Sequence, residues 1–130
     1  KTFHAVHSCL RKGGIFAFDF WYGPSVIKKG CSPKEIQVET NDYRMIRKSS
    51  PSILGQDNCL LIEQSYSIQN KKTNEYENFN EVHKVRYFDE KQLSSFLNKC
   101  GFEVIRFEAF LGHNPLQDTD WAGMAFARAT

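Results

Sequence analysis

The sequence predicts an α/β fold in which helices cover a sheet that carries a β-rich insertion. Two segments support the core of this prediction: a continuous apolar strand at 15–20, and a helix–turn–strand segment that begins at residue 89. A short apolar run without alternation is typical of a strand buried on both faces. Between these segments, residues 34–88 alternate apolar and polar side chains, which is typical of antiparallel strands with one solvated face.

The first part of the chain is expected to be a helix followed by the buried strand. Four side chains recur at helical spacing in residues 1–11: Phe3, Val6, His7 and Leu10. Gly13 and Gly14 are expected to end this helix, because glycine adopts left-handed backbone conformations at little cost. Turn residues at 23–30 predict a loop. Asp19 lies near the carboxyl end of the strand, where ligands bind in open α/β sheets.

The middle of the chain is expected to form three or four antiparallel strands. Alternation is visible near 36–40, 43–47, 60–68 and 79–87, and the polar stretch 70–74 predicts a turn.

The last third is expected to contain one helix and two strands. Asp89 with Gln92 is a variant of the capping box, and it precedes apolar residues at helical spacing. Gly101 should end this helix. Strands are then expected at 102–110 and 121–129. Because only a ten-residue loop separates these strands, an antiparallel pair is the simplest arrangement.

Composition narrows the class of protein. The 130 residues are 41% hydrophobic and 25% charged, which is ordinary for one globular domain or part of one. A net charge of +2 without a concentrated basic patch argues against a nucleic-acid partner. Aromatic residues make up 14%, which indicates a large apolar core or an apolar cavity.

Other features bear on the cellular compartment. The longest apolar run, 14–22, is far shorter than the roughly 20 residues of a membrane span, so no membrane partner is expected. The four cysteines are scattered and include no C-x-x-C pair, which favours free thiols in a reducing cytoplasm over disulfides. No signal peptide is visible. The chain begins with Lys1 inside a predicted helix, so we expect a piece of a longer protein.

Three segments together resemble one known family. The first, FHAVHSCLRKGGIFAFDFWYG, resembles the helix, Gly-Gly turn and fifth strand of Rossmann-like S-adenosylmethionine-dependent methyltransferases. The second, EVHKVRYFDEKQLSSFLNKCGFEVI, is similar to the part of these transferases that leads through a helix and a G-F turn into their sixth strand. The third, DWAGMAFARA, is similar to their seventh strand, which runs antiparallel to the rest.

The resemblance implies that the chain is the C-terminal half of a seven-stranded Rossmann-like sheet, with strands five to seven present. Residues 1–22 and 89–130 would form its core, and 34–88 would be an antiparallel insertion over the active site. The cofactor would be S-adenosyl-L-methionine. The family's glycine-rich loop and the acidic residue ending its second strand are absent, so its main cofactor motif would lie upstream. The expected first partner is therefore the missing N-terminal half, and this chain alone should be inactive.

Three residues at the end of the first strand are candidates for substrate binding: Asp19, Trp21 and Tyr22. Their carboxylate and aromatic faces could form the wall of a pocket that contacts a cationic amine or sulfonium. The alternative is structural: the two rings would pack a lid on the core, and Asp19 would cap a turn.

A second group of candidates lies in the strand that precedes the last helix. His83 is the candidate catalytic base, since an imidazole can accept a proton near neutral pH. Arg86 and Tyr87 are candidate substrate-binding residues. Strand parity places His83 and Tyr87 on one face and Arg86 on the other. The alternative for His83 is a purely structural role. No metal is expected, because His4 and His7 share a helix face without a third ligand nearby.

Two functions from different classes remain. The first is methyl transfer from S-adenosyl-L-methionine to a small-molecule acceptor, an amine or a hydroxyl, with a sugar as one candidate. The alternative is a non-catalytic module that binds a ligand or protein on its aromatic-lined antiparallel sheet. If the chain ended at Lys1, its sheet would have an open edge, so self-association into a homo-oligomer is also expected.

Overall fold

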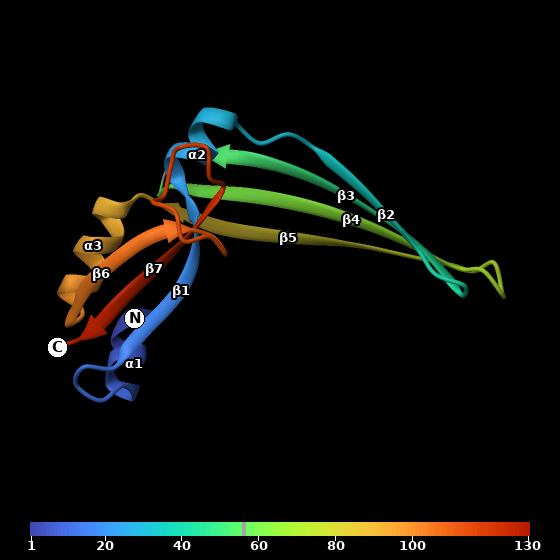
Figure 1. Cartoon of the computed structure of the whole chain (residues 1–130). Helices are drawn as coiled ribbons and strands as arrows, with labels where there is room; N and C mark the ends of the chain where they lie inside the picture. The colour runs from blue at the N-terminus through green and yellow to red at the C-terminus, as the bar shows by residue number, and fades with distance from the viewer. Residues whose placement is uncertain (56) are drawn as a thin grey trace. The chain divides into compact units, whose positions relative to one another are not determined.

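A computed structural model describes residues 1–55 and 57–130, and Figure 1 shows the arrangement of their helices and strands. In chain order these are α1 (Thr2–Cys9), β1 (Ile15–Tyr22), α2 (Gly23–Lys29), β2 (Lys34–Glu39), β3 (Tyr43–Leu54), β4 (Cys59–Asn70), β5 (Tyr76–Phe88), α3 (Glu90–Lys99), β6 (Phe102–Ala109) and β7 (Ala122–Ala129). The chain divides into two compact units. The first unit comprises Lys1–Lys29 with Tyr87–Thr130, and the second comprises Gly30–Arg86.

The strands form a mixed α/β sheet, which confirms the predicted class. Over the described residues, seven strands are hydrogen-bonded in the order β2-β3-β4-β5-β1-β7-β6. β1 runs parallel to the last residues of β5 and antiparallel to β7. The predicted antiparallel pairing of the last two strands is also confirmed: β6 and β7 pair from Phe102–Ala129 to Ala109–Gly123, with one register shift between Val104 and Arg106.

The core of the first unit forms where α1 and α3 pack against the sheet. Phe16, Phe18, Phe20 and Tyr22 lie at alternate positions of β1 and share one face. Phe3 of α1 contacts Phe16 and Phe18, with ring centroids 6.0 and 5.4 Å apart. The remaining buried side chains of the two core clusters come from α3, β6 and β7: Leu93, Leu97, Phe102, Ala125, Ala127 and Ala129.

The prediction that strand 15–20 is buried on both faces is wrong for this chain. Exposed and covered positions alternate along β1: Ile15 is 51% exposed, and Ala17 and Asp19 are also exposed. The physical reason is that α1 and α3 contact only the phenylalanine-bearing face. The apolar residues on the other face, which made the run look doubly buried, have no such cover.

The predicted loop at 23–30 is also wrong, since Gly23–Lys29 form the short helix α2. Pro24 stands in its first turn, where the missing N–H of proline removes no intrahelical hydrogen bond. Val26 is fully buried, so the helix is held by packing that the turn-rich composition conceals.

Helix α3 begins as the capping pattern predicts. The Asp89 carboxylate accepts a hydrogen bond from the backbone N–H of Gln92 at 2.7 Å. The reciprocal half of a capping box is not formed. The side-chain Oε1 of Gln92 is buried and has no hydrogen-bond partner among the described residues.

The second unit is an antiparallel meander of β2, β3, β4 and most of β5, as the alternation predicts. Its register runs without a shift from Tyr43–Asn70 to Leu54–Cys59 and from Cys59–Arg86 to Gln69–Tyr76. No helix of the described residues, in either unit, is long and apolar enough to cross a membrane.

We expect Gly101→Ala to destabilise the first unit by about 1–3 kcal/mol. Gly101 has a φ of +85°, and an added Cβ would lie 2.8 Å from Nε2 of His7. Chemical denaturation of the variant measures the loss. Gly13→Ala is the matched control, because Gly13 has a φ of +82° and open space around the added Cβ. An equal loss in both variants would show that the contact with His7 contributes nothing.

We expect stability to fall as the pH rises above 10, through Tyr22. Burial raises the pKa of the Tyr22 phenol above its ordinary value of 10.0, and the carboxylates of Glu90, Asp118, Asp89 and Asp120 raise it further. The unfolded chain therefore releases this proton at a lower pH than the folded chain, which favours unfolding.

Urea unfolding of Tyr22→Phe and of the unmodified chain, at neutral pH and above pH 10, measures this linkage. The free energy of unfolding should fall less in the variant. Tyr76→Phe, at a tyrosine that is 60% exposed, serves as the control. The same pH dependence in Tyr22→Phe as in the unmodified chain would contradict the assignment.

Candidate functional site

The carboxyl end of β1 gathers residues from three distant segments of the first unit. Trp21 pairs with Tyr87 of β5 on one side and with Ala122 of β7 on the other, and Tyr22 pairs with Phe88. The side chains of Tyr22 and Tyr87 are only 8% and 6% exposed. Two of the predicted substrate-binding residues thus belong to the packed interior, where they support the end of the strand.

An aromatic pair forms at this end of the strand. The rings of Trp21 and Trp121 lie 5.7 Å apart at an angle of 60°. The backbone N–H of Tyr22 donates to the carbonyl oxygen of Trp121 at 3.0 Å, which fixes the two segments to each other. Trp121 remains 37% exposed, so the pair offers aromatic surface to a ligand.

The loop that carries Trp121 is fastened to α2. Lys28 Nζ forms a 2.7 Å ion pair with Asp118, and Lys29 donates to the carbonyl oxygen of Thr119. The Asp120 carboxylate accepts from the backbone N–H of Gln117, which closes a turn inside the loop. These contacts hold the end of the loop beside the carboxyl end of β1.

Carboxylates and the two lysines of α2 share this region. Four of the carboxylates act on Tyr22: Glu90, Asp118, Asp89 and Asp120. The carboxylates have different partners. Asp89 caps α3, and Asp118 forms an ion pair with Lys28 that lowers the pKa of Asp118. A carboxylate that lies beside an aromatic ring suits a cationic group.

Asp19 lies on the open face of β1, together with Ala17 and Trp21. It pairs in register with Met124 of β7, and it is exposed. The two-residue period of the strand places Asp19 and Trp21 next to each other on this face, about 7 Å apart along the strand. Tyr22 points to the opposite, helix-covered face.

His83 and Arg86 belong to the part of β5 that lies in the second unit. His83 pairs in register with Ile62, and its Nε2 lies 3.2 Å from Oε2 of Glu81. The imidazole is half exposed, so it is accessible to a ligand. The uninterrupted register keeps His83 and Arg86 on opposite faces of the strand, as their parity predicts.

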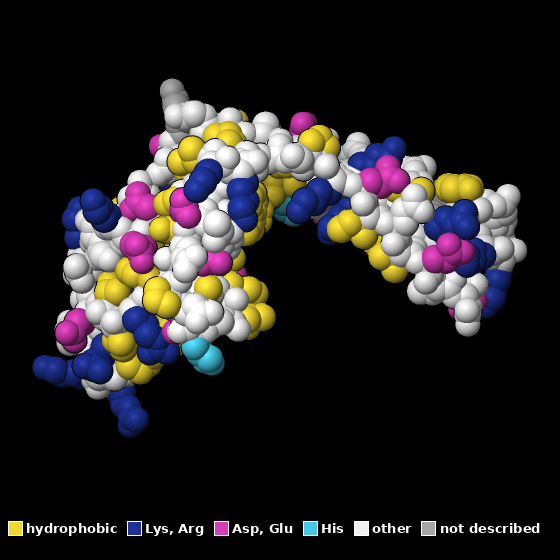
Figure 2. Space-filling model, turned by 45° about the horizontal axis from the view of Figure 1, so that its top comes forward, with side chains coloured by type: hydrophobic (Ala, Val, Ile, Leu, Met, Phe, Trp, Pro, Cys, Tyr) yellow, Lys and Arg dark blue, Asp and Glu magenta, His cyan; other side chains and the backbone are white. Residues whose placement is uncertain are grey.

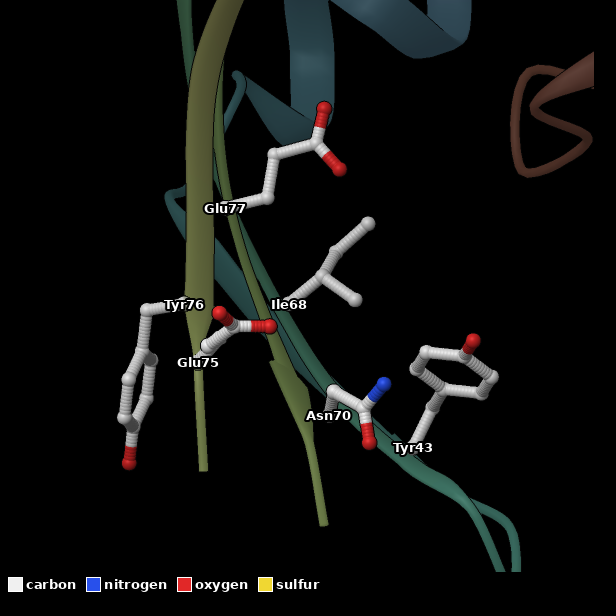
Figure 3. Close-up of a pocket in the computed structure, with 6 residues that line it drawn as sticks. All are labelled: Tyr43, Ile68, Asn70, Glu75, Tyr76 and Glu77. Atoms are coloured by element: carbon white, nitrogen blue, oxygen red, sulfur yellow. The ribbon is translucent and has the colours of Figure 1, made fainter. Parts of the chain in front are cut away.

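A separate depression of about 630 Å³ lies near the 70–75 turn of the second unit. It is lined by Tyr43, Ile68, Asn70, Glu75, Tyr76 and Glu77. In Figure 3 the side chains of Ile68, Tyr43 and Glu77 extend to one side of the strands, and Tyr76 points to the other. Glu77 precedes His83 by six residues, about 20 Å along the strand. The lining contains no histidine, cysteine or serine that could act as base or nucleophile.

Neither a metal site nor a complete cofactor cradle is formed by the described residues. No group of three His, Cys, Asp or Glu side chains in residues 1–55 and 57–130 could hold a metal ion. A dinucleotide or nucleoside cofactor is typically held by a glycine-rich turn between a strand and a helix. The two strand-to-helix junctions of this chain do not fit, because β1 passes directly into α2 and the start of α3 is closed by Asp89.

The sequence places Trp121 at the end of a loop of ordinary turn composition that could also border a substrate site, and it indicates only a solvated turn for Lys28 and Lys29. A signal for Trp121 was present. The chain has two tryptophans, one at the end of a predicted strand and one at the start of a strand that the resemblance makes antiparallel to the rest, and such positions lie at the same edge of a sheet. The lysines carried no such signal, because the helix that positions them was expected to be a loop.

No family model matches the sequence, and no curated protein does. Solved structures do match. DesVI of Streptomyces venezuelae is 14% identical, with a TM-score of 0.73 over 98% of this chain and 49% of its own. CalS10, an amino pentose methyltransferase from Micromonospora echinaspora with SAM bound, is 16% identical, with a TM-score of 0.71 over the same shares of the two chains.

A third match is an S-adenosylmethionine-dependent methyltransferase from Clostridium acetobutylicum. It is 15% identical, with a TM-score of 0.69 over 98% of this chain and 49% of its own. This chain therefore spans about half the length of the solved structures that it matches. Nearly the whole of it has the fold of the corresponding part of S-adenosylmethionine-dependent methyltransferases, sugar methyltransferases among them.

Proposed function

We propose that the protein transfers a methyl group from S-adenosyl-L-methionine to a small-molecule acceptor, and that this chain supplies the acceptor side of the site. One observation carries the proposal: in a methyltransferase-like fold, the Trp21–Trp121 pair and nearby carboxylates lie at the carboxyl end of β1. In open α/β sheets this end of the strands is where ligands bind.

An amine on a sugar is the acceptor that we favour; it would bind as the ammonium form and lose a proton to the base before its lone pair attacks the methyl group. One structural neighbour is named as an amino pentose methyltransferase, and KedS8 from Streptoalloteichus, with a TM-score of 0.70 and 17% identity, is named as a sugar N-methyltransferase. The exposed Asp19 carboxylate and the aromatic surface at the end of β1 suit a cationic amine better than an anionic acceptor.

The substrate-binding residues that we propose in the first unit are Asp19, Trp21, Tyr22 and Tyr87. Trp21 would present its ring to the acceptor, and the Asp19 carboxylate would attract its charge. Tyr22 and Tyr87 are buried, so they would act mainly by holding this wall in place. In the second unit we propose Arg86 as a further substrate-binding residue.

His83 is the proposed general base. With Glu81 accepting from the Nε2–H of the imidazole, Nδ1 would be free to take the proton of the attacking amine or hydroxyl. Bound S-adenosyl-L-methionine supplies an electrophilic methyl group on a sulfonium. Methyl transfer itself needs the nucleophile to be positioned in line, so the larger contribution of this chain would be orientation of the acceptor.

The cofactor cradle is proposed to lie in residues outside this chain. The open face of the first unit supports this, because it exposes apolar residues that a folded protein normally covers: Ile15, Ala17, Met124 and Phe126. A missing N-terminal half would cover this face and bring the glycine-rich turn. The boundaries at 29/30 and 86/87 likewise support an insertion at 34–88.

The proposed location is the cytoplasm. All four cysteines of the described chain are free thiols, and Cys9 is exposed, which suits a reducing compartment.

Isothermal titration with S-adenosylhomocysteine tests the function. We expect saturable binding by the protein that includes its upstream residues and weak or no binding by residues 1–130 alone. Mass spectrometry of amino sugars incubated with the longer protein and S-adenosyl-L-methionine should show a gain of about 14 Da, one CH₂. Absence of cofactor binding by the longer protein would sink the proposal and favour the non-catalytic binding module.

Two substitutions separate the roles of the site residues in the longer protein. His83→Gln should lower kcat by about 100-fold or more if His83 is the base, because the glutamine side chain cannot accept the proton. Trp121→Ala should mainly raise the KM for the acceptor, because it removes binding surface. His4→Gln, on exposed α1, is the control. An unchanged kcat in His83→Gln would assign His83 a structural role.

A further inference from the structure

Helix α2 presents two lysines to a loop that lies 90 residues further along the chain. Ser25 and Val26 of this helix are fully buried. With about 3.6 residues per turn, Lys29 lies between Ser25 and Val26 in projection along the helix axis, and Lys28 lies beside Ser25. Ile27 lies on the other side and is 64% exposed. In Figure 1 the loop that precedes β7 passes beside α2. Burial of one helical turn therefore directs the lysines of the next turn toward this loop.

The two lysines contact two successive residues of the loop. Nζ of Lys28 forms an ion pair with the Asp118 carboxylate at 2.7 Å, and Nζ of Lys29 donates to the carbonyl oxygen of Thr119. The hydrogen bond from Lys28 lowers the pKa of Asp118 below its ordinary value of 3.8. The carboxylate is therefore charged at neutral pH, and the pair with Lys28 stays formed.

The part of the loop that the lysines contact is a closed turn. The backbone N–H of Gln117 donates to the Asp120 carboxylate at 2.8 Å, and the N–H of Asp120 donates to the carbonyl oxygen of Gln117 at 2.9 Å. Among the described residues, the hydrogen bonds and ion pairs that join residues 117–120 to another element are those of Lys28 and Lys29. The turn is therefore a small rigid body, and the two lysines fix its position.

The residues on either side of the turn are attached to the sheet. Leu116 packs against the core, and the carbonyl oxygen of Trp121 accepts from the Tyr22 N–H at 3.0 Å. Because that carbonyl is fixed, a rotation of the turn changes φ of Trp121 and with it the direction of the indole. In the structure the indole lies 5.7 Å from that of Trp21. The position of the turn thus determines how the two tryptophan rings meet.

We propose that Lys28 and Lys29 are positioning residues for the acceptor. They hold the 117–120 turn against α2, which directs the indole of Trp121 toward Trp21 and completes the aromatic surface that the acceptor contacts. The lysines act through Trp121 and touch no reacting atom. This use of the tryptophan pair rests on the proposed function, whereas the geometry of the pair is measured without it.

Positioning, and not stability, is what this ion pair contributes. The side chains of Lys28 and Asp118 are 61% and 55% exposed, and exposed ion pairs add little to stability. Figure 2 shows other Lys and Arg side chains at the surface of the molecule, so a loss of surface charge in general needs a control. Lys99 supplies it, because it is exposed and ends α3 as Lys29 ends α2.

The exciton coupling of the two indoles, seen in far-ultraviolet circular dichroism, tests the proposal in the 130-residue chain. The chain has two tryptophans, so Trp121→Phe should abolish the couplet and assign it to the pair with Trp21. Lys28→Met combined with Lys29→Met should lower its amplitude at least about twofold, because the rings lose their mutual geometry while the fold remains. Lys99→Met should leave the amplitude unchanged.

A charge exchange tests whether the ion pair itself is responsible. Asp118→Lys should also lower the couplet, because it places a third cation beside Lys28 and Lys29. Adding Lys28→Asp should restore the amplitude to within about 20% of that of the unmodified chain, as coupled residues do in a double-mutant cycle. Thermal unfolding reports whether each variant is folded, and the exchange decides the question if the double lysine variant is not.

Kinetics of the longer protein separate positioning from catalysis. Lys28→Met combined with Lys29→Met should raise the KM for the acceptor about fivefold and leave kcat within about twofold, because the lysines act on a binding surface. In a Trp121→Ala background the same two changes should raise the KM no further, because their effect passes through Trp121. Binding of S-adenosylhomocysteine should be the same in all of these variants.

Four outcomes would overturn the proposal: no couplet in the unmodified chain, an undiminished couplet in the double lysine variant, an equal loss in Lys99→Met, or a KM that rises by the same factor with and without Trp121. Failure of the proposed function has a different signature. The longer protein would then not bind S-adenosylhomocysteine, while the couplet would still report whether the lysines position the tryptophan pair.

Discussion

The packing of alternate aromatic side chains of β1 against α1 and α3 is the contact on which the first unit depends. Phe16, Phe18 and Phe20 form a continuous line of ring contacts, with centroid distances of 4.6 and 6.4 Å between successive rings. Aromatic side chains bury more area than any others, so this line dominates the stability of the unit. Because the strand has a two-residue period, the same packing directs Ala17, Asp19 and Trp21 away from the helices. One constraint therefore creates both the core and the open face.

The candidate site is a consequence of how that strand ends. At Trp21, β1 pairs in parallel with β5 and antiparallel with β7. The carboxyl ends of β1 and β5 and the start of β7 therefore lie side by side. The Tyr22 backbone, fixed by the core, holds the Trp121 carbonyl, and the lysines of α2 hold the rest of the loop. An exposed ion pair contributes little stability by itself. Its value here is positional, because it adds a second attachment to a loop that Leu116 already packs against the core.

Much of this architecture could be predicted because its signals are local. Alternation fixed the antiparallel strands, and Asp89 with Gln92 marked the start of α3. The predictions that failed concern contacts between residues that are distant in the sequence. The apolar run at 15–20 could not reveal that helices would contact one face alone, and Pro24 with Gly23 indicated a turn although burial of Val26 makes a helix. The Trp21–Trp121 contact joins residues 100 positions apart, so only knowledge of strand pairing could have placed them together.

Both units expose apolar side chains on one side of their strands, and in the first unit part of that surface is shielded. On the open face of the first unit, Arg106 lies 4.0 Å over the Phe126 ring and pairs with Glu108 at 2.8 Å, so part of the apolar surface is shielded within the chain. A long arginine stem can cover such surface while its charge is satisfied. In the second unit, Ile36, Val38 and Phe79 lie on one side of the strands and are 41%, 47% and 38% exposed. The open face of the first unit therefore suits a covering segment and a ligand.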